Sequence, residues 1–397
     1  MYDPYRYTVD RKLITVTVIS DLVTDYRVHK ICQTLHNEGY SVLLIGSIKK
    51  RSLPLKLRDY QTDRIKTWFH GSALFYAEFN IRLFFRLLHQ KPDIFLGNDL
   101  DVMPATMLSA SLRKKPVVYD SHEFFLGMAG MDKKPIRRNI WKYIEKSILA
   151  RLKYMYTVSD SIRDLYGRIY HEKLFVVRNL PQKNPDKTSL SAEELNLLRS
   201  IEERIPENKH LLIFQGAGIN ESRGAEELVL SMQFLNAEDY HLLIIGGGDV
   251  FPKLEKMIEL YHLRSKITLI PKLPFTLLCR LTPKAQLGIS IDKSTVLNHK
   301  YSLPNKLFEY LHASVPVLAS RLIEQERIIN GFEVGDFIDD YQPERIAEKI
   351  KEIFANPEKL KRWKQNTCKV RETLNWENES KIVIDIFKQV ERDSVNS

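Results

Sequence analysis

Short apolar runs alternate with longer amphipathic segments along most of the chain. Valine, isoleucine and leucine fill both faces of runs such as LITVTVIS and HLLIIGG, a pattern typical of strands in a parallel sheet that is covered on both sides. The segments between them repeat apolar residues at helical spacing. The predicted strands are 13–20, 41–47, 93–98, 116–121 and 154–159 in the first half, and 210–216, 241–247, 267–271, 287–291, 315–320 and 335–339 in the second.

These strands form two consecutive series, and the chain of 397 residues is too long for one ordinary core. Residues 181–194, PQKNPDKTSLSAEE, separate the series, and we interpret this polar stretch as a linker. We therefore predict an α/β protein with two doubly wound, Rossmann-like domains, at 1–185 and 195–374. The domains would face each other across a cleft, with ligands near the carboxyl ends of the strands. A final amphipathic helix is predicted within 375–397.

The net charge of +10 belongs to the first half of the chain. Residues 1–190 contain 32 Lys and Arg against 19 Asp and Glu, so the remainder is slightly acidic. A basic surface can face anionic lipid, nucleic acid or an acidic substrate, or can simply be solvated. No recognised nucleic-acid motif accompanies the charge, so nucleic-acid binding is the weakest of these interpretations. The segment 73–90 is apolar around most of its circumference, which suits either packing on the sheet or docking on a membrane.

Cysteine usage and hydropathy favour a cytoplasmic location. The three cysteines, Cys32, Cys279 and Cys368, lack metal-ligand spacing, and their odd number disfavours a disulfide framework. No apolar run approaches the length of a membrane span, and no export signal is recognisable. The motifs GxSxG, HExxH, CxxC and GxxxxGKS are absent from the sequence, which disfavours hydrolase, zinc and P-loop chemistry.

Two glycine-containing loops in the second series are candidates for binding a phosphate. The loop after the first strand holds Gly216 and Gly218, which permit a close backbone approach, and Arg223, which can reach an anion. Ordinary strand-to-helix turns use the same residues. The next loop holds three glycines centred on Gly247, followed by Asp249. This run lacks the GxGxxG spacing, so we do not predict an NAD site.

The segment YSLPNKLFEYLHASVPVLAS, residues 301–320, predicts a helix whose first turn includes Pro304, followed by a buried strand. Lys306 and Glu309 lie three residues apart on one face near the helix start, where backbone N–H groups favour anions. Taken alone, a surface ion pair explains the two residues equally well. Together with Arg223 and the glycine loops, they describe a pocket for a phosphate-bearing ligand, with a carboxylate available for ribose hydroxyls.

The first half offers polar side chains after two of its strands. Asp120, His122 and Glu123 follow the strand VVYD, at the predicted cleft where a sugar or an acceptor could meet them. A structural role for the histidine is the alternative. Asp99 and Asp101 have the DxD spacing that holds a divalent metal in some sugar-transferring folds. Those folds are built differently from this two-domain pattern, so we predict no metal site there.

These motifs together resemble the family 4 glycosyltransferases of the GT-B fold, the bacterial enzymes that extend cell-surface polysaccharides and glycolipids. The resemblance covers nearly the whole chain. It includes the stretches SDLVTDYRVHKICQTLHNEGYSVLLIG, VVYDSHEFF, IEKSILARLKYMYTVSDSI, FQGAGINESRG and LPNKLFEYLHASVPVLAS. The last of these is the most specific, because its order of proline, lysine, glutamate, small residue, proline and strand is hard to obtain by chance.

The resemblance implies a nucleotide-sugar donor, such as a UDP- or GDP-sugar, bound by the C-terminal domain. The acceptor, a sugar or lipid-linked sugar, would bind mainly to the N-terminal domain, and the helix in 375–397 would cross back to that domain. Glu309 would bind the donor ribose. Arg223 and Lys306 would neutralise the diphosphate leaving group without a metal or other cofactor. The anomeric configuration would be retained without an enzyme nucleophile, and His122 would lie near the transferred sugar.

Two positions depart from the family's pattern. Tyr301 replaces the first of two motif glutamates, so Tyr301 and Ser302 are expected at the donor site without that carboxylate, and the loop before Arg223 lacks a second basic residue. A non-catalytic protein that binds nucleotide-sugars is therefore one alternative. A UDP-sugar epimerase of similar fold is another, although its typical carboxylates are not evident. A lipid-linked acceptor would suit peripheral contact with the cytoplasmic face of an anionic membrane.

Overall fold

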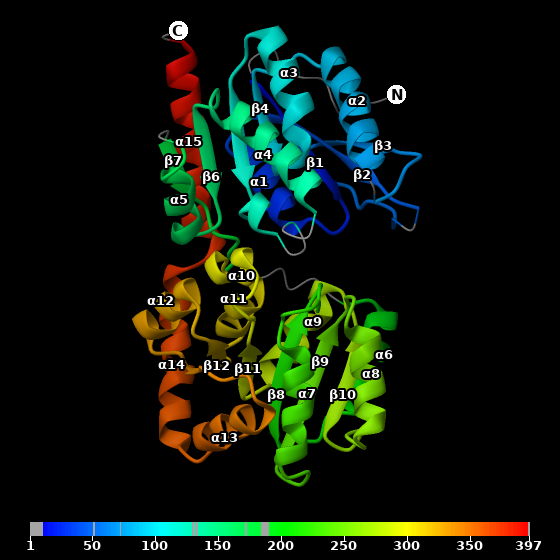
Figure 1. Cartoon of the computed structure of the whole chain (residues 1–397), viewed down its shortest axis with the longest axis vertical. Helices are drawn as coiled ribbons and strands as arrows, with labels where there is room; N and C mark the ends of the chain where they lie inside the picture. Colours follow the sequence, from blue (N-terminus) through cyan, green and yellow to red (C-terminus); the bar gives the residue numbers. More distant parts are fainter. Residues whose placement is uncertain are drawn as a thin grey trace. The chain divides into compact units, whose positions relative to one another are not determined.

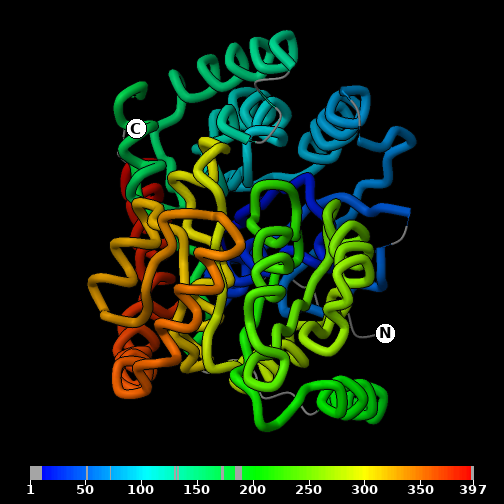
Figure 2. The backbone as a smooth tube through the Cα atoms, turned by 60° about the horizontal axis from the view of Figure 1, so that its bottom comes forward, coloured from blue at the N-terminus to red at the C-terminus, as the bar shows by residue number. Residues whose placement is uncertain are grey.

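The computed structural model describes residues 11–50, 52–71, 73–128, 131, 134–170, 173–183 and 190–395. The chain divides into two compact units, one formed by residues up to 179 together with those from 379 onward, and the other by residues 180–378. The tube in Figure 2 follows the two strand–helix series in turn, from blue to green and then from green to orange. Residues 184–189 of the expected linker and residues 396 and 397 of the expected final helix lie outside the described residues.

The first unit is built on a seven-stranded parallel sheet with the order β3-β2-β1-β4-β5-β6-β7 (Figure 1). The strands are β1 (Leu13–Asp21), β2 (Ser41–Ile48), β3 (Gln61–Lys66), β4 (Ile94–Asn98), β5 (Val117–Ser121), β6 (Tyr154–Thr157) and β7 (Lys173–Val176). The five predicted strands are confirmed. The two edge strands, β3 and β7, were not predicted, because QTDRIK is mostly polar and KLFV is only four residues long.

Helices pack against this sheet and are themselves amphipathic. They are α1 (Tyr26–Asn37), α2 (Ala73–His89), α3 (Met103–Arg113), α4 (Pro135–Leu149) and α5 (Asp160–Gly167). In α2, Phe79, Leu83 and Leu87 are buried in a core cluster, which confirms packing on the sheet. The same helix leaves Ile81 and Phe85 more than half exposed. Among the described residues, no helix combines the length and apolar character needed to cross a membrane.

The final helix, α15 (Trp376–Val395), belongs to the first unit from Glu379 onward. It lies beside β6 and β7 in Figure 1, where it is red. The backbone N–H of Arg178, just after β7, donates to Glu379 Oε1 at 2.6 Å, and the Tyr154 hydroxyl on β6 donates to Asp393. The inward face of this part of the helix is apolar and buried, and consists of Val383, Ile386, Phe387 and Val390.

The second unit holds a six-stranded parallel sheet with the order β10-β9-β8-β11-β12-β13. Its strands are β8 (His210–Gly216), β9 (Tyr240–Gly246), β10 (Ile267–Pro271), β11 (Leu287–Ser290), β12 (Val317–Ser320) and β13 (Gly335–Ile338). All six predicted strands are confirmed. The strand order reverses between β8 and β11, as it does between β1 and β4 in the first unit, and ligands of open α/β sheets bind at such switch points.

Both faces of the second sheet are covered, which explains why its strands are apolar on both sides. In β8, Leu212 and Phe214 join a core cluster with α7, α8 and α13, whereas Leu211 and Ile213 join a different cluster with α6 and α11. The helices are α6 (Ala192–Glu202), α7 (Ala225–Ser231), α8 (Phe251–Leu260), α9 (Phe275–Leu281), α10 (Leu297–Tyr301), α11 (Asn305–His312), α12 (Ile323–Phe332), α13 (Pro343–Phe354) and α14 (Pro357–Thr373).

Truncating Phe387 to alanine should lower the free energy of unfolding of the first unit by about 3–5 kcal/mol, because the ring is fully buried and its removal leaves a cavity. The control is Phe85→Ala on α2, where the ring is 57% exposed and the change should stay below about 0.5 kcal/mol. Denaturant unfolding, followed by circular dichroism, would measure both. Equal effects of the two substitutions would contradict the packing of α15 on the first unit.

Candidate functional site

In the second unit, two cations converge on one buried carboxylate at the switch point. Asp292 lies two residues after the end of β11 (Ser290) and is 2% exposed. Arg223 Nη1 lies 3.0 Å from Asp292 Oδ1, and Lys306 Nζ lies 3.5 Å from both carboxylate oxygens. We call Arg223, Asp292 and Lys306 the cation cluster. The cluster carries a net positive charge of one, so it can accept an anion at the carboxyl edge of the sheet.

The charges of the cation cluster shift the pKa values of Asp292 and Lys306. Burial alone would raise the pKa of Asp292, but Lys306 and Arg223 outweigh it and hold that pKa below its usual value. Burial lowers the pKa of Lys306, which is 8% exposed; Asp292 offsets part of this effect and Arg223 adds to it. The Lys306 ammonium also lies 4.5 Å from the ring centroid of Phe214. The interpretation of Lys306 and Glu309 as a surface ion pair is wrong, because Lys306 is buried and contacts Asp292.

Glu309 is held one turn further along α11, which begins at Asn305, one residue later than expected, with Pro304 as its N-cap residue. Its Oε2 accepts a hydrogen bond from Gln215 Nε2 at 2.5 Å. Gln215, the penultimate residue of β8, is itself fixed, because its Oε1 accepts from the Thr282 hydroxyl at 2.9 Å. The side chain of Glu309 is thus anchored at the carboxyl end of β8 and remains partly exposed.

The two glycine loops are joined to each other above the ends of β8 and β9. Gly247 N–H donates to Gly216 O at 3.4 Å, and Ile219 N–H donates to Gly247 O at 2.6 Å. Packing requires glycine at the neighbouring Gly246, where a Cβ atom would lie 2.1 Å from Gly216 O. By contrast, no described atom lies within 4 Å of a Cβ built at Gly247, and one built at Gly216 or Gly218 makes ordinary contacts. Gly247 therefore leaves open space beside the loops, whereas a side chain at Gly216 or Gly218 would contact Ile219 or Asn220.

Tyr301 and Ser302 lie at the end of α10 and just after it, both partly buried. The preceding turn of this helix carries His299, which the sequence analysis did not single out. His299 is 8% exposed, and burial together with Arg223 lowers its pKa to about 4. A neutral imidazole therefore stands beside the cation cluster.

In the first unit, His122 lies in a polar cluster with Arg27, Asn98, Asp99 and Asp120, which we call the histidine cluster. Asp120, at the end of β5, is fully buried and accepts two hydrogen bonds from Arg27 on α1, at 2.7 and 3.0 Å. His122 Nε2 lies 3.2 Å from Asp120 Oδ2, and Nδ1 lies 3.1 Å from Asp99 Oδ2. Burial would raise the pKa of Asp120, but Arg27 and His122 hold it below its usual value.

Several residues of these clusters were not predicted. Asp292 and Gln215 sit at strand ends, the position by which His122 was singled out, so the same rule could have identified them. Arg27 carries no such signal, because its partner Asp120 is 93 residues away in the sequence. Glu123 lies beside His122, and its backbone carbonyl accepts from the Ser121 hydroxyl at 2.8 Å. Within the described part of the chain, no three His, Cys, Asp or Glu side chains converge as a metal site would require.

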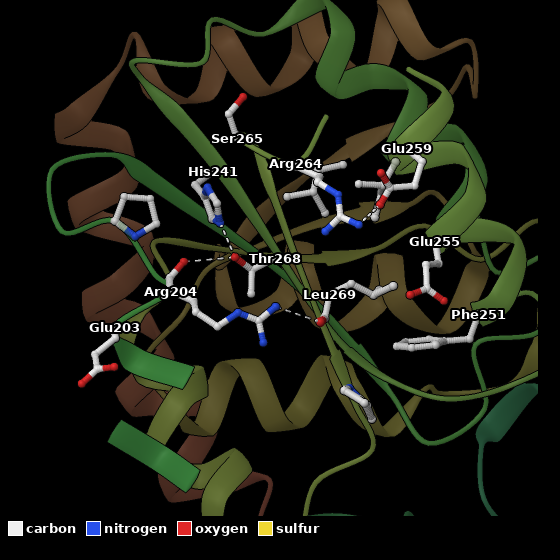
Figure 3. Close-up of a pocket in the computed structure, with 14 residues that line it drawn as sticks. Glu203, Arg204, His241, Phe251, Glu255, Glu259, Arg264, Ser265, Thr268 and Leu269 are labelled. Carbon is white, nitrogen blue, oxygen red and sulfur yellow. Dashed lines mark hydrogen bonds and ion pairs between the residues drawn. The ribbon is translucent and has the colours of Figure 1, made fainter. Parts of the chain in front are cut away.

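A separate pocket of about 730 Å³ lies along the edge strand β10 and the helix α8, away from the predicted residues (Figure 3). His241 Nε2 and Thr268 Oγ1 are hydrogen bonded there at 2.8 Å, and burial lowers the pKa of His241 to about 4. Cations and carboxylates both line the pocket, among them Arg204, Arg264 and Glu259. Its position and mixed charge distinguish it from the cation cluster.

Two family models match the chain in succession. The model for glycosyltransferase family 4 matches residues 25–180, and that for group 1 glycosyl transferases matches residues 199–370. The first match contains the histidine cluster and the second contains the cation cluster. The chain belongs to the family 4 glycosyltransferases.

Solved structures confirm the GT-B fold of this glycosyltransferase family member. Sucrose-phosphate synthase from Thermosynechococcus elongatus has a TM-score of 0.77 at 16% identity, covering 96% of this chain and 100% of that one. HepE from Anabaena, in complex with UDP-glucose, has a TM-score of 0.70 at 10% identity, covering 97% and 100%. WaaG, a glycosyltransferase involved in lipopolysaccharide biosynthesis, has a TM-score of 0.65 at 14% identity, covering 94% and 99%. A comparison with curated proteins gave no match.

Removing the cation from the buried pair of the histidine cluster should destabilise the first unit. Arg27→Ala should lower the free energy of unfolding of the first unit by about 3–5 kcal/mol. Asp120 would remain buried, and only part of its negative charge would still be balanced by a cation. Arg86→Ala breaks an exposed pair with Asp63 in the same unit and should cost at most about 1 kcal/mol. Thermal and denaturant unfolding would compare them, and a cost for Arg27→Ala no larger than for Arg86→Ala would refute this energetic role.

Proposed function

We propose that this protein is a retaining glycosyltransferase that moves a sugar from a nucleoside-diphosphate donor to a sugar or lipid-linked sugar acceptor, in the synthesis of a surface polysaccharide or glycolipid. The observation that carries the proposal is the convergence of Arg223 and Lys306 on Asp292 at the β8–β11 switch point, with Glu309 anchored nearby. Family membership supports a transfer reaction, and the cluster supplies the charge that a nucleotide-sugar donor needs.

The donor diphosphate would lie against Arg223 and Lys306. Its departure builds negative charge, and fixed cations at a partly desolvated site stabilise that charge most effectively. Arg223 is 30% exposed and can turn toward a ligand, whereas Lys306 is buried and already in place. In the bound state both cations would be shared between Asp292 and the phosphate oxygens. Arg223 and Lys306 would therefore stabilise the leaving diphosphate without an added metal.

Glu309 would accept hydrogen bonds from the ribose hydroxyls. Its carboxylate already accepts one bond from Gln215, which fixes its direction and leaves further acceptor capacity. The nucleotide would lie against the glycine loops, where Gly216, Gly218 and Gly247 carry no side chain and Gly247 faces open space. Tyr301 and Ser302, at the end of α10, would contact the donor from the side of α11.

The transfer would proceed by attack from the same face as the departing diphosphate, through a short-lived oxocarbenium-like ion pair. This route retains the anomeric configuration and needs no enzyme nucleophile. His122, in the histidine cluster, would lie near the transferred sugar. The acceptor would bind to the first unit.

The nucleotide site can be tested by titration calorimetry with UDP, GDP and dTDP in the absence of added metal. One nucleotide should bind preferentially, and Arg223→Ala and Glu309→Ala should each weaken it roughly 10- to 100-fold, because each removes charge-assisted hydrogen bonds. Arg345→Ala and Glu348→Ala, which break an exposed ion pair on α13, are matched controls that should change nothing. Absence of nucleotide binding, or unchanged binding by the two site variants while they remain folded, would refute the site.

Turnover distinguishes the alternatives once the nucleotide is known. Transfer from the corresponding nucleotide-sugar to an acceptor, with retained configuration at the new bond, would support the proposal. Conversion of the donor into an epimeric UDP-sugar without any acceptor would instead support an epimerase. Nucleotide binding with no consumption of donor would indicate a non-catalytic member of the family.

A lipid-linked acceptor would also require contact with an anionic membrane, and α4 offers a surface for it. Ile136, Ile140 and Tyr143 lie on one face of this helix and are 77%, 55% and 74% exposed. Exposed basic residues flank them on the same helix, namely Arg137, Arg138 and Lys142. Apolar side chains beside basic ones are the combination that binds anionic lipid surfaces.

The protein should therefore float with vesicles of phosphatidylcholine and phosphatidylglycerol, and not with vesicles of phosphatidylcholine alone. Replacing both Ile136 and Tyr143 by serine should reduce the bound fraction several-fold, because the inserted apolar surface is lost. Leu260→Ser, at a residue 69% exposed on α8 of the second unit, is the control and should bind as the wild type does. Equal flotation of all three proteins would exclude α4 as the docking surface.

A further inference from the structure

The imidazole of His122 is bracketed by carboxylates on both sides of the ring. Nδ1 lies 3.1 Å from Asp99 Oδ2, and Nε2 lies 3.2 Å from Asp120 Oδ2. Asn98 Oδ1 is also 3.3 Å from Nε2, and its orientation is set because Asn98 Nδ2 donates to Thr17 O at 3.0 Å. The side chain of His122 is 19% exposed. Among the described residues, the polar side-chain atoms found to contact its ring nitrogens are therefore oxygens that accept hydrogen bonds.

This arrangement fixes the protonation state of the ring. An ionised carboxylate can only accept hydrogen bonds, so each ring nitrogen must carry a proton to satisfy its neighbour, and the ring is then an imidazolium. Burial would lower the pKa of His122, but Asp99 and Asp120 outweigh it and raise that pKa well above its ordinary value. Asp120 is already paired with Arg27, so Asp99 is the carboxylate that balances the histidine charge.

Asp99 holds the backbone of His122 as well as its ring. Its Oδ1 accepts from the His122 backbone N–H at 2.9 Å, and its own N–H donates to Asp120 O at 2.9 Å. To make these contacts, Asp99 adopts φ 63° and ψ 161°, a conformation in which residues other than glycine are rare. Such a conformation costs about 1–3 kcal/mol and persists only where its surroundings compensate for it. This conformation allows Asp99 to contact the backbone of His122, the ring of His122 and the backbone of Asp120 at once, and these three contacts fix the position of His122.

Asp101 and Arg27 are further titratable groups near His122. Asp101, on the short helix after β4, is 8% exposed, and burial together with the charge of Asp99 raises its pKa well above its ordinary value. Arg27, from α1, faces His122 only across Asp120. The four ionised groups thus alternate in sign, in the order Arg27, Asp120, His122 and Asp99.

We propose that Asp99 is a positioning residue that, together with Asp120, holds His122 as an imidazolium. Both ring N–H groups then donate to these two carboxylates. His122 therefore acts in transfer as a fixed positive charge and not as a base. The catalytic part of this inference rests on the proposed function, whereas the charge state of His122 does not. A neutral histidine would leave one ring nitrogen lone pair facing a carboxylate, which is repulsive. Removing the Asp99 charge should therefore release the proton at a lower pH.

The charge state can be measured on the full chain labelled with ¹³C and ¹⁵N at histidine, with the His122 signals assigned by their loss in His122→Gln. In the wild type, the ring should remain doubly protonated from about pH 6 to about pH 8. Asp99→Asn and Asp99→Gly should lower the midpoint by roughly one to three pH units. The glycine variant also removes the backbone strain at position 99. Equal midpoints in Asp99→Asn and Asp99→Gly would therefore exclude strain as the cause of the shift. Asp63→Asn, which removes a partly exposed, ion-paired carboxylate on β3, should not shift the midpoint.

Activity supplies the second readout. In Asp99→Asn, kcat for sugar transfer should fall as the pH rises through the lowered midpoint and recover at lower pH, while the nucleotide affinity stays unchanged because the cation cluster is intact. A wild-type midpoint near the ordinary pKa of about 6.5, or a midpoint unaffected by Asp99→Asn, would overturn the proposal. A shifted midpoint in a protein that transfers no sugar would uphold the locked imidazolium and refute the proposed function.

Discussion

A buried carboxylate, neutralised by cations from neighbouring elements, stands at the carboxyl edge of each parallel sheet. Asp120 is held by Arg27 and His122, and Asp292 by Arg223 and Lys306. Burying a carboxylate without a cation beside it costs several kcal/mol of folding free energy. Each of these carboxylates therefore requires its cations to stay close to it. Those cations come from different helices and loops, and the carboxylate thereby fixes their geometry before any ligand is present. The other polar residues of both clusters are arranged around these two charges.

The arginines that pair with Asp120 and Asp292 differ in their exposure to solvent. Arg27 is buried with Asp120 and turns inward, where Arg27 Nη1 also donates to Val177 O at 3.0 Å. It therefore ties α1 to the segment after β7 and is part of the framework. Arg223 is partly exposed at the end of a loop, where its side chain can reach solvent. The same type of contact thus belongs to the framework in one unit and to the proposed anion site in the other.

The sequence predicted the central strands well, because β1, β2, β4, β8 and β9 must be apolar on both faces to fill two layers of core. It could not predict β3, whose pattern is diluted by polar residues, or β7, which is only four residues long. The sequence singled out His122 and Arg223 because they follow strands, and Lys306 and Glu309 because they lie near the start of a helix. It could not show that Lys306 pairs with Asp292 and not with Glu309, because that choice depends on the depth of the side chain and on contacts made in three dimensions. The DxD spacing of Asp99 and Asp101 did not show that Asp101 is buried whereas Asp99 contacts His122, because burial depends on the packing of the whole unit.

The division of the chain has a consequence for how the protein is made. Because the first unit contains both the residues up to 179 and those from 379 onward, the second unit is an insertion within the first. The buried residues of α15, such as Phe387, are synthesised after the second unit, whereas the sheet that they cover is synthesised before it. The second unit can therefore complete its core while the first unit still has one apolar flank uncovered. The unit whose synthesis starts first is thus the one whose core is completed second.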